Sequence, residues 1–110
     1  MGLDAKKLTG DMLSAALPIL RGGASDIETY AKSEFTKIAQ AMVMIGSQFA
    51  TKEINDEQAR LLLKMQENAS RSVFLTVQGM TLLTAEQAIN AALDVVKGAV
   101  NTALGFALII

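Results

Sequence analysis

Carboxylates are the residues of this chain with the widest scope for chemistry, because they can hold a metal ion or transfer a proton. A diiron bundle takes a Glu from each of two helices and a Glu-x-x-His pair from each of the other two. Glu28, Glu34 and Glu67 fit part of that arrangement, but the 110-residue chain contains no His and no Cys. The ligand set cannot be completed, so we expect no metal site and no cofactor.

Motifs for nucleophilic catalysis and nucleotide binding are missing as well. The sequence has no GxGxxG, GxxxxGK[ST] or GxSxG pattern. Ser and Lys both occur, so a Ser-Lys dyad stays formally open, but no spacing favours one and nothing else suggests an oxyanion site. We expect a protein that is not an enzyme, that has no catalytic residues and that takes no small-molecule substrate.

The composition argues for a folded, apolar chain. Apolar residues make up 51% and charged residues 19%, against about 25% charged in a typical soluble domain. Low charge and high apolarity argue against disorder, and they suggest more apolar surface than a chain of this length easily hides alone. The net charge of −1 provides no basic field, so we expect no nucleic-acid partner.

Charge is unevenly distributed along the sequence. Residues 1–71 hold 18 of the 21 charged residues, and residues 72–110 hold only Glu86, Asp94 and Lys97. So uncharged a stretch must be shielded from water, whether by its own fold, by copies of itself or by lipid.

Apolar periodicity predicts an all-α fold in a single domain, 1–110, with a short first helix. Leu8, Met12 and Ala16 fall on one stripe of an amphipathic helix over 3–17. Pro18 and the pair Gly22-Gly23 mark the break that follows it.

Two further helices are predicted from their capping signals. Ser25 and Glu28 form a capping box that starts a helix over 26–50. Asn55 and Gln58 form a similar box, after which no Pro interrupts a long helix over 56–108, although Gly79 allows a kink.

The short connection between these two helices predicts an antiparallel hairpin. In the expected register, Glu34 lies near Arg71. Apolar residues at alternating spacings of three and four predict a coiled-coil-like contact. We name it the hairpin seam, with residues Phe35, Ile38, Met42, Ile45, Phe49, Leu62 and Met65. The Met residues are interpreted as core, in preference to an adaptable apolar groove.

The end of the long helix carries a second apolar pattern, in which nine positions are spaced three or four apart. This C-terminal seam comprises Leu82, Ala85, Ile89, Ala92, Val96, Ala99, Ala103, Phe106 and Ile110. One short N-terminal helix is not expected to cover so wide a face. We therefore predict that the seam is the interface of a homo-oligomer, which completes the helical bundle.

A narrow polar stripe that includes Asp94 and Lys97 faces away from this seam. In a soluble bundle these two residues are expected to face water, whereas in a membrane oligomer they would line a lumen. Only 13 residues follow Lys97, fewer than the roughly 20 that a spanning helix needs. Soluble or peripheral assembly is favoured on these grounds.

Three functions follow from these patterns. The leading hypothesis is a non-enzymatic structural or assembly subunit, by analogy with small helical components of virions and secretion machines. The alternative is a membrane-associated or pore-forming helical protein, and the third is an adaptor that binds a partner helix. No signal peptide is evident, because Asp4 and Asp11 interrupt the first residues. A cytoplasmic or particle-associated location is favoured, and membrane association stays open.

Overall fold

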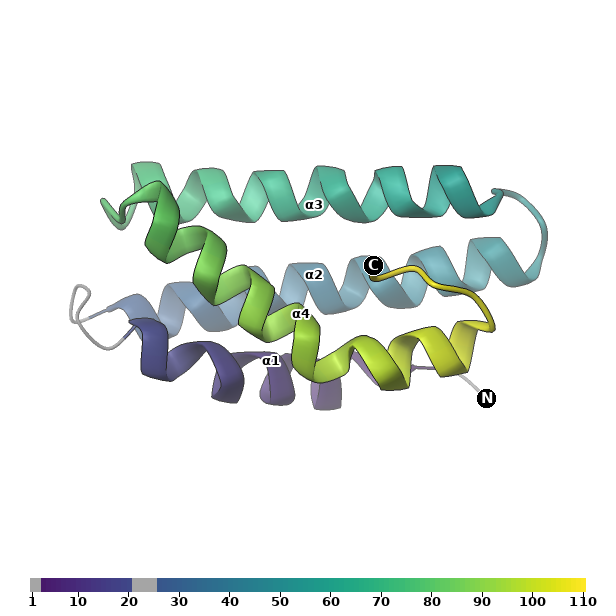
Figure 1. The fold of residues 1–110 in the computed structure, drawn as a ribbon, viewed down its shortest axis with the longest axis horizontal. Helices are drawn as coiled ribbons and strands as arrows, with labels where there is room; N and C mark the ends of the chain where they lie inside the picture. Colours follow the sequence, from purple (N-terminus) through teal and green to yellow (C-terminus); the bar gives the residue numbers. More distant parts are fainter. Residues whose placement is uncertain (1–2, 21–25) are drawn as a thin grey trace.

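The computed structural model describes residues 3–20 and 26–110, and this part of the chain forms four α-helices (Figure 1). The helices are α1 (Ala5–Leu20), α2 (Ile27–Ala50), α3 (Asp56–Thr76) and α4 (Leu82–Leu104). The described residues contain no strand, which confirms the all-α expectation. The bundle measures 41 × 21 × 19 Å.

Helix α1 begins after Asp4, whose carboxylate accepts hydrogen bonds from the amides of Lys6 and Lys7 at 3.0 and 3.4 Å. The helix continues to Leu20, so Pro18 lies inside its last turn and does not end it. Proline cannot donate to the carbonyl four residues earlier, but that residue, Ser14, is exposed and its carbonyl can be hydrated. The predicted break at 22–23 and the Ser25 capping box lie outside the described residues.

Helices α2 and α3 run side by side in opposite directions (Figure 1). The predicted capping box at the start of α3 is confirmed. Asn55 Oδ1 accepts from the Gln58 amide at 2.8 Å, and Gln58 Oε1 accepts from the Asn55 amide at 2.9 Å. These bonds satisfy two amide donors that would otherwise lack partners at a helix start.

The prediction of one helix over 56–108 is wrong, because a turn at 77–81 separates α3 from α4. Gly79 adopts φ 65°, a left-handed conformation that costs glycine little. The Met80 amide donates to the Phe74 carbonyl at 3.1 Å and closes the turn. Thr81 then caps α4, its hydroxyl accepting from the Thr84 amide at 3.2 Å. Helix α4 also ends early, at Leu104, because Gly105 is left-handed with φ 79°.

The turn changes the packing, because α4 runs diagonally back from the end of α3, in front of α2, and packs against α1 (Figure 1). All four helices contribute large side chains that are fully buried. These are Met12, Leu20, Phe35, Ile38, Met42, Leu63, Phe74, Ile89, Val96 and Val100. Each such side chain contributes about 1.5–3 kcal/mol by leaving water, so this shared core holds the four helices together.

The ion pairs also reflect the turn. Glu34 and Arg71, which were expected to lie near each other, form ion pairs with other residues instead. Arg71 Nε lies 3.9 Å from Glu86 Oε1 on α4, and Glu34 pairs with Lys37 at 3.0 Å on its own helix. The fold-back after α3 brings Glu86 beside Arg71, which a continuous helix would not do.

Candidate functional site

Four of the nine residues of the C-terminal seam face the interior of the single chain. Ala85, Ile89, Ala92 and Val96 have at most 1% of their surface exposed. Their predicted place in an oligomer interface is therefore wrong for this fold. The physical reason is that α1 lies along α4 and buries its own stripe, including Met12 and Ala16, against that face.

The other five residues of the C-terminal seam have different surroundings. Leu82, Ala99 and Ile110 are exposed, while Ala103 and Phe106 are half-buried. Phe106 stacks on Phe49 of α2, with ring centroids 4.1 Å apart. Three exposed residues spread over 82–110 do not form a continuous contact surface by themselves.

The structure buries the hairpin-seam residues of α2 but leaves those of α3 exposed. Phe35, Ile38, Met42 and Ile45 are buried and Phe49 is half-buried, but Leu62 and Met65 are exposed. Helix α3 instead buries Ala59, Leu63, Glu67, Ser70 and Phe74. Helix α4 also packs against α3, so the inward face of α3 meets two neighbours and not α2 alone.

This packing leaves an apolar groove between α2 and α3. The α2–α3 groove has a volume of about 510 Å³ and is lined by Ala41, Met44, Ile45, Gln48, Ile54, Leu62, Met65 and Gln66. Met44 is 59% exposed, Met65 58% and the adjacent Leu61 61%. Long apolar side chains thus stand in water along both walls.

The α2–α3 groove is also uncharged. No charged residue occurs from 38 to 51 on α2, and the residues lining the groove from α3 are Leu62, Met65 and Gln66. Sequence reasoning missed the groove because it assigned Met65 to the core. A usable signal was present in the run Leu61-Leu62-Leu63, since three consecutive helical residues cannot all face one side.

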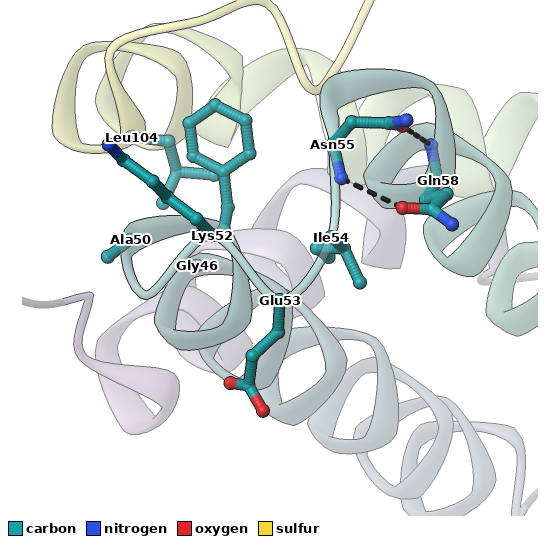
Figure 2. Close-up of a pocket in the computed structure, with 9 residues that line it drawn as sticks. Gly46, Ala50, Lys52, Glu53, Ile54, Asn55, Gln58 and Leu104 are labelled. Carbon is teal, nitrogen blue, oxygen red and sulfur yellow. Dashed lines mark hydrogen bonds between the residues drawn. The ribbon is translucent and has the colours of Figure 1, made fainter.

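A second hollow, of about 660 Å³, lies beside the connection between α2 and α3 (Figure 2). Its polar groups do not converge on a common point. The Lys52 and Glu53 side chains point away from each other, and the Glu53 carboxylate accepts from the Thr51 hydroxyl at 2.6 Å. Asn55 and Gln58 are occupied by the capping box, so we assign no chemistry to this hollow.

The carboxylates considered for chemistry are dispersed in the structure. Glu34 and Glu67 are buried, but each lies near a lysine of its own helix, Lys37 at 3.0 Å and Lys64 at 3.8 Å respectively. Glu28 is exposed. Within residues 3–20 and 26–110, no three acidic side chains gather into a group that could hold a metal ion.

Asp94 and Lys97 are both exposed on α4. No ion pair within 4.0 Å joins either of them to another described residue. We predict that replacing both residues with Ala leaves the midpoint of urea unfolding unchanged within error, because exposed charges contribute little to stability. A clear loss of stability in that titration would instead assign the two residues a structural role.

Comparison of the chain with models of protein families, with curated proteins and with solved structures finds no match. Among the described helices, none is both long and apolar enough to cross a membrane.

Proposed function

We propose that this protein is a non-enzymatic assembly subunit that associates with copies of itself through the α2–α3 groove. One observation supports the proposal. The groove has no charged lining residue, and Met44 on one wall and Met65 on the other are each more than half exposed.

The chemistry of this groove favours a protein partner. Single exposed apolar residues are normal on any protein surface, but residues gathered around a groove are typical of interaction sites. The cores of protein interfaces are enriched in Met and depleted of charge. Met side chains are also flexible enough to fit a partner surface without a fixed shape.

The polar rim of the groove favours a second copy as that partner. Gln48 and Gln66 line the groove with amides, which both donate and accept hydrogen bonds. In a two-fold contact the same surface faces itself. An amide can pair with its own image, whereas a charged rim would repel its own image.

Helix α4 is a weaker candidate for the contact. Its exposed apolar residues include Leu82 and Leu83 at its start and Val95 further along. Val95 lies twelve positions after Leu83, about 18 Å along the helix at 1.5 Å per residue. We therefore still propose self-association, as the sequence predicted, but we place the contact at the α2–α3 groove and not at the C-terminal seam.

The direct test is Met44→Glu combined with Met65→Glu. We expect light scattering over a range of concentrations to show an oligomer for the unsubstituted chain and a monomer for the variant. A carboxylate buried without a partner is strongly unfavourable. Helical circular dichroism should be retained, because both residues are exposed in the single chain.

The matched control is Leu83→Glu combined with Val95→Glu, which adds the same charge at exposed apolar positions of α4. This control should keep the molar mass of the unsubstituted chain. A chain that is monomeric at every concentration contradicts self-assembly. Binding of an amphipathic helical peptide by that monomer, lost with the Met substitutions, would favour the adaptor function instead.

A further inference from the structure

The last described residues turn back into the space between α3 and α4 (Figure 1). We call Phe106–Ile110 the closing segment. It borders a cavity to which α3 contributes Arg60, Leu63, Lys64 and Glu67 and α4 contributes Asn90, Leu93 and Asp94. We call this space, which the segment partly fills, the α3–α4 wedge.

The closing segment is held in the way that a protein holds a bound peptide. Asn101 Nδ2 donates to the Ile109 carbonyl at 2.9 Å, and Asn101 Oδ1 accepts from the Ile109 amide at 3.0 Å. Arg60 Nε donates to the Ala107 carbonyl at 2.9 Å. Leu108 and Ile109 are 3% and 5% exposed. The side chains of Asn101 and Arg60 thus hydrogen-bond the backbone of the segment, and two adjacent apolar side chains of the segment are buried.

The fit within one chain is incomplete. An open cavity of about 190 Å³ remains beside Leu108 and Ile109. Ile110 lies at the edge of this cavity and is 88% exposed. Because α4 ends at Leu104, only Gly105 joins the segment to the helix, and this short connection limits how deeply the segment can enter.

Gly105 also provides a hinge. It adopts φ 79°, and glycine moves between positive and negative φ at little cost. A change at this one residue would direct the closing segment away from its own wedge while leaving α4 intact.

We propose that the α3–α4 wedge binds the closing segment of a second copy, so that neighbouring copies exchange these segments. The occupant is identified by the segment already seated there, since every hydrogen bond and apolar contact described above can be remade between copies. Exchange of identical elements is a low-cost route to association for this reason. A segment from another copy is not tied through Gly105 to the α4 that borders this wedge, so that connection does not set how far it enters.

The exchange site is separate from the α2–α3 groove. The wedge uses Leu63 and Glu67 on α3, while the groove uses Leu62 and Met65. The two proposals therefore stand or fall independently. The segment of the same chain competes with that of a second copy for the wedge, at an effective concentration in the millimolar range. Exchange is therefore favoured only where the copies themselves are present at comparably high local concentration.

The test exploits the absence of Cys from the sequence. Chains carrying Ile110→Cys are mixed with tagged chains carrying Asn90→Cys, and a short bismaleimide joins thiols that lie close together. Both positions border the wedge cavity. The matched control replaces the second chain with one carrying Val95→Cys, an exposed position that does not line the wedge.

We expect the Ile110→Cys and Asn90→Cys mixture to give at least tenfold more mixed cross-linked pair on a gel than the control mixture. Equal yields overturn the proposal, provided that one chain carrying both substitutions cross-links internally under the same conditions. Failure of that internal reaction overturns it too, because the segment would then not occupy its own wedge. Repeating the mixture with Met44→Glu and Met65→Glu present separates exchange from association through the groove.

A second measurement uses the full chain and a synthetic peptide. In Leu108→Asn with Ile109→Asn, the chain's own segment no longer supplies apolar side chains. A fluorescent peptide of sequence GFALII should bind this variant at least tenfold more tightly than it binds the unsubstituted chain, by fluorescence anisotropy. Adding Asn101→Ala should remove that gain. Equal weak binding to all three chains overturns the proposal, and if the variant unfolds, the cross-linking result decides.

Discussion

Val96→Asp is expected to unfold the protein at every concentration. Val96 is 1% exposed and lies on the buried face of α4, the helix that packs mainly against α1. An aspartate there would be charged and without a partner in an apolar surrounding, which is among the most costly single changes. We expect a loss of more than about 4 kcal/mol, comparable with the whole stability of many small domains. Circular dichroism without denaturant should show that the variant has lost the helical signal of the unsubstituted chain.

The adjacent residue provides the control. Val95 is 54% exposed, so Val95→Asp introduces the same side chain on the same helix without burying it. It should shift the urea midpoint little, as surface substitutions do. If Val96→Asp stayed folded and only lowered the molar mass, the C-terminal seam would be a contact between subunits after all, and the position of α1 against α4 would be incorrect.

The local signals in the sequence predicted local structure well. The capping box of Asn55 and Gln58 fixes the start of α3, because its bonds need only residues close together in the chain. The apolar positions of α2 also predicted its buried face. The four positions, which lie on one side of the helix and are all buried, are Phe35, Ile38, Met42 and Ile45. Such signals depend on side chains within a few residues of one another.

The turn at 77–81 was harder to predict. The sequence offers one Gly and no Pro there, and the apolar spacing continues across it. A helix tolerates a single Gly at a cost of about 1 kcal/mol. That cost falls on the continuous helix and is too small to force a break by itself. The turn is favoured when the gain from packing α4 against α1 exceeds the loss of helical hydrogen bonds at 77–81, and this gain depends on residues far earlier in the chain.

Periodicity predicts that a helix has an apolar face, but it does not say what covers that face. The positions Ile89 and Val96 are equally suited to a second copy and to α1, and the structure uses α1. On α3, Leu62 and Leu63 differ by one position, and only Leu63 is buried. The run Leu61-Leu62-Leu63 indicates that a leucine must be exposed, but spacing alone does not show which one. The α2–α3 groove exists only because α3 turns Leu63 inward.

Phe74→Ala should have the second large effect. Phe74 is fully buried on α3, and its ring lies 6.0 Å from that of Phe35 on α2, at an interplanar angle of 58°. Removing a buried Phe side chain costs about 3–5 kcal/mol, because apolar contact is lost and a cavity is left. Urea unfolding monitored by circular dichroism should show a loss in this range, and Val77→Ala, at an exposed position just after the helix, should show almost none.

The ring pair makes a further quantitative test. If the two rings stabilise each other, Phe35→Ala and Phe74→Ala together should cost less than the sum of the single losses, by about 0.5–1.5 kcal/mol. Strict additivity would mean that the rings contribute only their separate burial. A loss below about 1 kcal/mol for Phe74→Ala would contradict the inward face of α3, and with it the exposure of Leu62 and Met65 on which the proposed groove depends.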